Sequence, residues 1–340
     1  MRPGLSQLAG MIVIAAATLH AQPTNGAVYW STDPNLDCSA LGESPATITN
    51  SSGTTIGYSC YVTGTFVWLA TGGIWGTSIR VAAPASNPIG VDYSIYAQDG
   101  TNLSLDYNMG SGTSTASGND ITFALKANQP AVVNLLGAAG GAPSYSAPES
   151  GSVYVHIFCP DATTCLNATP QLIYSSLPTY PWSLSVPIAW DDFVFTQWSA
   201  EAIDDGQQHV VSLVIYNETP NSSTYKIDIF DSTGKQVASY TTPTINGFNS
   251  STGEGGTYAV LLRDVIPNLP SGIFKVLVDG GSNYSAGEVL QITGASATTL
   301  QVAPDTGPSA ALIGAVVRSR DSVRRLRGSP APRAAFRPIG

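Results

Sequence analysis

The residues of this 340-residue chain that could support catalysis are few and scattered. A nucleophilic triad needs a serine or cysteine, a histidine and an orienting acid within hydrogen-bonding reach. Beyond the N-terminal segment only His156 and His209 remain, and neither lies in a G-x-S-x-G or comparable nucleophile turn. The glycines of GAAGGAP at 137–143 lack the spacing and the following helix of a phosphate-binding loop. The sequence therefore argues against a triad hydrolase and against a phosphate site of this kind.

A group of acidic residues in the middle of the chain is the other candidate for catalysis. Glycosidases in all-β folds use two carboxyl groups held a fixed distance apart. Adjacent strand residues point to opposite faces, so neither Asp191 with Asp192 nor Asp204 with Asp205 is such a pair by itself. Glu201 would need a loop to bring it to the later aspartates. We expect solvated loop acids, and a secreted glycoside hydrolase or lyase that uses the acids near 191–205 is the alternative.

No metal or cofactor site is predicted. The spacings of the four cysteines include no C-x-x-C, and His156 lies in the alternating run SVYVHIF, which is typical of a strand. Asp204 and Asp205 are not part of a regularly spaced loop of oxygen ligands, as a calcium site would require.

Aromatic residues give a better indication of binding. Rigid aromatic faces can stack on sugar rings at a low cost in conformational entropy. The predicted ligand-binding residues are Tyr180, Trp182, Trp190 and Trp198. The alternative is that these rings, like Trp68 and Trp75, fill a core or an interdomain contact. The predicted partner is an extracellular polysaccharide or cell-surface polymer.

The N-terminus predicts export. MRPGLSQLAGMIVIAAATLHAQPT has one arginine, an apolar run and a short polar step that ends at Ala21. This pattern is typical of a signal peptide over residues 1–21, and its apolar run is too short to span a bilayer. We expect a secreted or cell-surface protein with no transmembrane span.

The cysteines agree with export, because an even number in an exported chain predicts disulfides. Three connectivities are possible for four cysteines. The sequential pairing of Cys38 with Cys60 and of Cys159 with Cys165 closes the shortest loops.

Charge is unevenly distributed. Residues 318–340 hold seven arginines and one aspartate, a net charge of +6, and Arg2 adds one. Since the whole chain carries −9, the remaining body carries −16. A body this acidic repels nucleic acid and anionic membranes. Residues 304–340, rich in proline and arginine, are predicted to form a disordered basic tail.

The body contains a repeated pattern. SIRVAAPASNPIGVDYSIYAQDG at 78–100 and SLVIYNETPNSSTYKIDIFDSTG at 212–234 have the same length and place their turns and final glycines at the same offsets. Further matches pair FVW at 66–68 with FVF at 193–195, AVVNLL at 131–136 with AVLLRD at 259–264, and SGSVYVHI at 150–157 with SGIFKVLV at 271–278. Shared order and spacing over this length indicate a duplicated module.

Each copy has the pattern of short strands joined by turns. Period-two alternation in YKIDIF, TYAVLL and FKVLV, separated by turns such as DSTG and PNLPSG, predicts a β-sandwich. We predict an all-β protein whose modules occupy residues 27–168 and 192–303. Prolines in 169–191 predict a stiff linker between them.

The succession of VIYNETP, IDIFDSTG and a strand before L-P-S-G resembles the tandem Ig-like or fibronectin-like modules of large secreted bacterial proteins. The resemblance covers roughly residues 60 to 302 and implies adhesion, spacing or ligand binding, with no catalytic residues to transfer. The first copy departs from the pattern, with AAPASNP where the second has YNETPNS. We therefore expect a non-catalytic adhesion, structural or glycan-binding protein.

Overall fold

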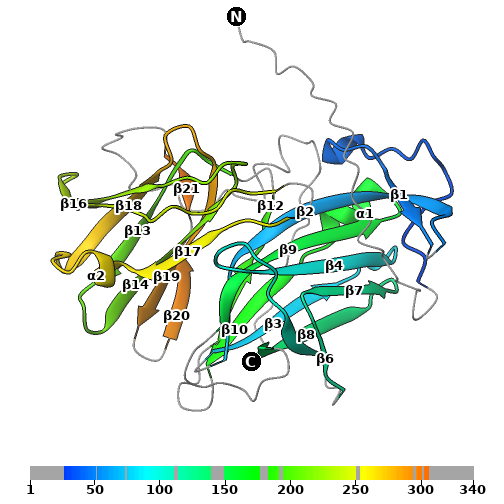
Figure 1. The fold of residues 1–340 in the computed structure, drawn as a ribbon, viewed down its shortest axis with the longest axis horizontal. Coiled ribbons are helices and arrows are strands. Elements are labelled where there is room, and N and C mark those ends of the chain that lie inside the picture. Colours follow the sequence, from blue (N-terminus) through cyan, green and yellow to red (C-terminus); the bar gives the residue numbers. More distant parts are fainter. Residues whose placement is uncertain are drawn as a thin grey trace, which may run out of the picture. The chain divides into compact units, whose positions relative to one another are not determined.

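The computed structural model describes residues 27–305 except 51, 73–74, 111–113, 139–148, 177–182, 191–193, 250–252, 294–295 and 301 (Figure 1). All described residues belong to one compact unit. The fold is all-β with several antiparallel sheets, as predicted from the alternation. The predicted signal peptide and the tail beyond Asp305 lie outside the described residues.

The first two sheets are formed by residues 46–190. The first contains, in order, β1 (Ala46–Thr49), β2 (Thr55–Thr71), β9 (Glu149–Cys159), β4 (Ile89–Ala97) and β7 (Asp120–Leu125), with β12 (Ala189–Trp190) also paired to β2. The second contains β11 (Ser183–Pro187), β10 (Gln171–Ser176), β3 (Trp75–Ala82), β8 (Pro130–Ala138), β5 (Leu105–Met109) and β6 (Ala116–Gly118). A short 3₁₀ turn, η1 (Ser39–Leu41), and the helix α1 (Ala162–Asn167) lie outside the sheets.

The other two sheets are formed by residues 197–304. The third contains β16 (Gln236–Thr241), β15 (Lys226–Asp231), β18 (Gly272–Asp279), β13 (Gln197–Asp204) and β21 (Ala303–Pro304). The fourth contains β17 (Thr257–Leu261), β14 (His209–Asn217), β19 (Ser285–Thr293) and β20 (Ser296–Leu300), and the helix α2 (Leu262–Val265) follows β17.

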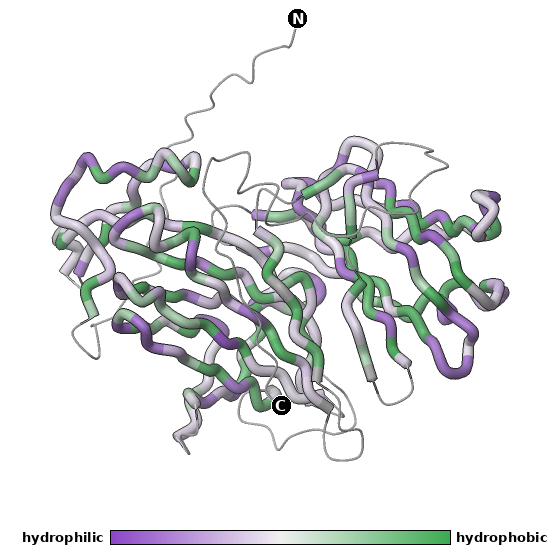
Figure 2. Tube along the Cα trace, turned by 180° about the vertical axis from the view of Figure 1, so that it is seen from behind, coloured by the Kyte–Doolittle hydropathy of each residue, from purple (hydrophilic) through white to green (hydrophobic). Residues whose placement is uncertain are grey.

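Each pair of sheets encloses a core of alternate strand residues, because successive side chains of a strand point to opposite faces. The first core contains residues of both the first and the second sheet, among them Val91, Val155, Ile79 and Leu172. The second core joins the third and fourth sheets through residues that include Ile227, Val276, Leu213 and Val289. Figure 2 shows the hydropathy of these strands along the chain.

The fourth sheet is buried on both faces. On β14, Leu213 and Ile215 belong to the second core, whereas Val214 and Tyr216 belong to the first. Ala286 and Leu290 of β19 also belong to the first core. This explains why VVSLVIY at 210–216 is almost continuously apolar, since a strand covered on both faces loses the polar half of its alternation.

The two sheet pairs have the same strand order, and the stretches 78–100 and 212–234 form corresponding strands in them. Strands β2, β3, β4 and β7 of the first pair correspond to β13, β14, β15 and β16 of the second. Strands β8, β9, β10 and β11 correspond in the same way to β17, β18, β19 and β20, and the edge strand β12 corresponds to β21. Among the described strands, β1, β5 and β6 belong to the first copy alone.

The structure differs from the predicted linker at 169–191. Strands β10 and β11 lie in the second sheet and β12 in the first. The prolines permit this because Pro170 precedes β10 and Pro187 ends β11, positions where a missing N–H costs no interior ladder bond.

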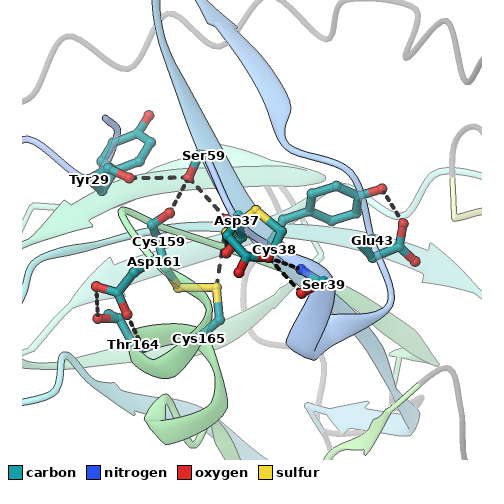
Figure 3. The surroundings of a disulfide bond; sticks show 12 residues. Tyr29, Asp37, Cys38, Ser39, Glu43, Ser59, Cys159, Asp161, Thr164 and Cys165 are labelled. Atoms are coloured by element: carbon teal, nitrogen blue, oxygen red, sulfur yellow. Dashed lines mark hydrogen bonds between the residues drawn. A yellow bond between two sulfur atoms is a disulfide. The ribbon is translucent and has the colours of Figure 1, made fainter. Parts of the chain in front are cut away.

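The predicted disulfides are confirmed (Figure 3). Cys38 is bonded to Cys60 and Cys159 to Cys165. Cys60 and Cys159 face each other across β2 and β9, so both bridges lie at one end of the first sheet. The helix α1 lies within the loop closed by Cys159 and Cys165. Asp161 caps its N-terminus, since the Asp161 carboxylate accepts the N–H of Thr164 at 2.8 Å.

Candidate functional site

A cleft of about 310 Å³ lies at the ends of β2, β3, β8 and β10, and it is called the Trp75 cleft here. β3 positions Trp75 and Ser78, β8 adds Asn134 and β10 adds Ser175. The pairing of Ser78 with Asn134 and of Gly76 with Ser175 brings these residues together. Gly76, having no side chain, leaves the space beside the Ser175 hydroxyl open.

Trp75 is held in place by two buried aromatic rings. Its ring meets Trp68 edge to face at a centroid distance of 5.1 Å, and meets Tyr174 at 5.9 Å. The Tyr174 hydroxyl donates a hydrogen bond of 2.5 Å to the carbonyl oxygen of Trp68, which ties the supporting pair together. Trp68 and Tyr174 are buried, whereas Trp75 is half-buried and lines the cleft. The cleft therefore contains an aromatic ring whose orientation is set by packing.

Polar groups line the cleft beside this ring. The Asn134 amide donates to Oδ1 of Asn108 at 2.8 Å and to the carbonyl of Gly110 at 2.8 Å, so the orientation of the amide is set. The Ser175 hydroxyl donates to the carbonyl of Gly76 at 3.3 Å. None of the described residues that line the cleft has a side chain that titrates. This arrangement suits binding of a neutral polar ligand and offers no group for acid–base catalysis.

The predicted ligand-binding aromatics are not gathered in one site by the described structure. Trp198 is fully buried in the second core, and its indole N–H donates to the Ser285 hydroxyl at 3.0 Å. A closed ring of this kind cannot stack on a ligand, so Trp198 is a core residue. Trp190 is half-buried on β12, opposite Gly64 of β2. Tyr180 and Trp182 lie outside the described residues.

The acids near 191–205 have structural partners where they are described. Asp204 is fully buried, pairs with the Arg263 guanidinium at 2.5 Å and accepts the N–H of Val211 at 3.1 Å. Asp205 accepts backbone N–H groups of the turn before β14 and lies 2.9 Å from Nδ1 of His209. Hydrogen bonds from the His209 side chain and backbone lower the pKa of Asp205 below its usual range.

Two acids remain from that group. Glu201 is exposed on β13 opposite Lys275, and Asp191 and Asp192 lie outside the described residues. Glycoside hydrolysis requires a second carboxylate near Glu201. Asp204 and Asp205 already hold the turn between β13 and β14, so neither of these two is free to serve as that second carboxylate.

A second polar constellation lies on the outer face of the first sheet. Thr63, His156, Asp92 and Thr122 are neighbours in register across β2, β9, β4 and β7. Nδ1 of His156 lies 3.9 Å from Oδ2 of Asp92, too far for a direct hydrogen bond. Burial lowers the pKa of His156 to about 4 and raises that of Asp92 to about 6, so at pH 7 the imidazole is neutral and the carboxyl ionised.

This pair is a poor ligand site because Nδ1 of His156 is closed off from solvent and no hydrogen-bond partner is described for it. Sequence reasoning identified His156 as a strand residue, which the structure confirms, but missed Asp92 because the two residues are far apart in the chain. The alternation of SVYVHIF was the available signal, since it places His156 on the outer face with Tyr154 and Phe158.

The described residues contain no group of three or more His, Cys, Asp or Glu side chains placed to bind a metal. Within the same residues, no helix is both long and apolar enough to cross a membrane. Comparison with protein-family models, curated proteins and solved structures finds no match for this chain.

Proposed function

We propose that this chain is a non-catalytic exported or cell-surface protein of two tandem Ig-like β-sandwich modules, and that it binds a neutral glycan in the Trp75 cleft. The observation that carries the proposal is the ring of Trp75, set by Trp68 and Tyr174, beside fixed hydroxyl and amide groups. Sugar rings are recognised by this combination of a stacking face and hydrogen-bonding groups.

The charge of the chain supports a neutral ligand. Without Arg2 and the basic residues 318–340, the body of the chain carries a net charge of −16, so it repels polyanions. The cleft has no cation among its described lining residues to offset this repulsion.

Two features support export. The N-terminal apolar run has the length and flanks of a signal peptide. Disulfides persist in oxidising compartments, and both cysteine pairs are bonded.

The repeated strand order supports the tandem modules, because nine corresponding strands occur in the same order in the two sheet pairs.

The test is calorimetric titration of the mature protein with a panel of neutral and acidic oligosaccharides. We expect a neutral oligosaccharide to bind, and expect Trp75→Ala to reduce its affinity by at least tenfold. Because Trp75 also packs on Trp68, Ser78→Trp is the second variant: it fills the cleft without removing that contact. Tyr284→Ala, which changes an exposed aromatic of the second sheet pair, is the matched control.

Unchanged binding in both cleft variants contradicts the site. Release of new reducing ends from the same panel, lost in Glu201→Gln, contradicts the non-catalytic assignment and supports the glycosidase alternative.

A further inference from the structure

Glu288 is a buried carboxyl group in an apolar contact. It lies on β19 between Ala286 and Leu290, and residues two apart on a strand share a face. Ala286 and Leu290 pack into the first core, so the face that carries Glu288 is turned toward the first sheet pair. We call this contact the junction and define it by Val214, Ala286 and Leu290 on the fourth sheet with the first-core residues that they touch.

The surroundings of Glu288 provide no compensation for a charge. Glu288 is 5% exposed, and neither carboxyl oxygen has a hydrogen-bond partner in the described structure. Across the ladder on β14 its neighbour is Val214, which is fully buried. An ionised carboxylate without partners in such surroundings is strongly unfavourable, whereas a protonated carboxyl loses much less on burial.

The titratable group that faces Glu288 from the first sheet pair is Tyr174 of β10, whose pKa is raised by burial and by the charge of Glu288. β2, which also packs against β19, contributes the uncharged Trp68 to the first core, and no hydrogen-bond partner is described for its buried indole N–H. No cation is described among the groups that act on Glu288. Below its raised pKa the Tyr174 phenol is neutral, and its hydroxyl donates to the Trp68 carbonyl, so Tyr174 gives Glu288 no counter-charge.

We propose that Glu288 makes the junction a proton-dependent contact between the two sheet pairs, closed around a protonated carboxyl and weakened when that carboxyl ionises. This contact lies within the chain and requires no ligand in the Trp75 cleft. An uncharged junction side chain would pack equally well at every pH, so a buried glutamate adds a dependence that the fold does not otherwise need.

The direction of the pH effect follows from proton binding. Burial raises the pKa of Glu288 from 4.5 to about 8. Between these values the folded protein keeps a proton at Glu288 that the unfolded chain releases, so the contribution of Glu288 to stability is fully present below about pH 4.5 and falls as pH rises through the window. Each proton released on unfolding raises the unfolding equilibrium constant by up to about tenfold per pH unit.

The first experiment compares urea unfolding of the full chain and of Glu288→Gln from pH 5 to pH 8, followed by circular dichroism. We expect the ratio of the wild-type to the variant unfolding constant to rise by about tenfold per pH unit. Glu201→Gln, an exposed glutamate of β13, is the matched control and should keep the wild-type pH profile. If Glu288→Gln does not fold, Glu288→Met replaces it. Parallel pH profiles of the wild type and the Glu288 variant overturn the proposal.

A second measurement locates the effect. Amide hydrogen exchange, corrected for its intrinsic pH dependence, should show loss of protection between pH 6 and pH 8 in β11 and β20, which contact each other between the two sheet pairs. The variant should retain that protection. Equal loss in β15 and β18, which lie in the third sheet, would show that the junction is not the responsive contact and would overturn the proposal.

Discussion

Replacement of Trp198 by alanine tests whether its ring is a core residue or a ligand-binding residue. The ring is fully buried, its N–H is bonded to the buried Ser285 hydroxyl at 3.0 Å, and it covers Gly287, where a Cβ would overlap it. Loss of a buried tryptophan costs about 3 to 5 kcal/mol through the cavity that it leaves. The unpaired Ser285 hydroxyl adds about 1 kcal/mol or more. We therefore expect Trp198→Ala to lower the free energy of unfolding by about 4 kcal/mol or more.

Urea unfolding followed by circular dichroism measures this change, and a double-mutant cycle with Gly287→Ala tests its cause. In the wild type the added methyl group at Gly287 overlaps the indole, so Gly287→Ala should be strongly destabilising. In the Trp198→Ala background the methyl group enters the cavity, so the same change should cost much less. A loss below about 1 kcal/mol for Trp198→Ala, in the range of exposed substitutions, would refute the packing argument.

Three further predictions concern a disulfide, a buried ion pair and a buried histidine. Replacing Cys38 and Cys60 by serine removes a disulfide of sequence separation 22 and should lower the free energy of unfolding by about 3 kcal/mol in chemical unfolding. Four free thiols, counted in the wild-type protein after denaturation without a reducing agent, would contradict both disulfides. Arg263→Met leaves buried Asp204 without its counter-charge and should cost about 3 to 5 kcal/mol, and unchanged stability would contradict the role of this ion pair. Because the pKa of His156 is lowered to about 4 from 6.5, His156 by itself contributes a loss of stability as pH falls between these values, while the raised pKa of Asp92 acts in the opposite direction below about pH 6; the ratio of the wild-type to the His156→Phe unfolding constant should therefore rise as pH falls from 6.5, and a ratio that does not change with pH would count against burial as the cause.

The sequence predicted the all-β fold and one register of the repeat. The gapless match of Ile95 with Ile229 agrees with the strand pairing, because Ile95 faces Val153 and Ile229 faces Val276 in corresponding ladders. Turn chemistry explains this success: AQDG and DSTG end corresponding strands with Gly100 and Gly234 at positive φ, a backbone conformation that favours glycine.

The other matches of the repeat were misplaced in different ways. The ladders pair Phe66 with Val153 and Ala200 with Val276, so the counterpart of Phe66 is Ala200 and not a residue of FVF at 193–195. A core tolerates different residue sizes at one position when neighbouring positions compensate in volume. Aligning two segments by residue type, such as one phenylalanine with another, therefore need not align structurally equivalent positions.

The remaining two matches differ in whether the error in alignment keeps each side chain on the same face of the sheet. SGSVYVHI against SGIFKVLV is shifted by two residues, which keeps each side chain on its face, since the ladders make Val153 the counterpart of Val276. AVVNLL against AVLLRD is shifted by one, which exchanges the faces, since Val133 and Val260 are the corresponding residues.

The candidate site could be predicted only in kind. The sequence indicated that aromatic residues would form a binding surface, but local sequence does not distinguish Trp75, which lines a cleft, from Trp198, which is buried against Gly287. That difference depends on residues distant in the chain. The same holds for Glu288, whose burial depends on the packing of two sheet pairs rather than on its own strand.

The burial of the fourth sheet on both faces limits how this repeat could be moved or reused. A fragment that begins at residue 192 would expose Val214, Tyr216, Ala286 and Leu290 as one apolar surface, and a large exposed apolar patch promotes self-association. The second sheet pair therefore depends on the first to cover one face of its fourth sheet. Because the two sheet pairs share this apolar contact, we expect a fragment that contains the second pair alone to self-associate rather than remain a soluble monomer.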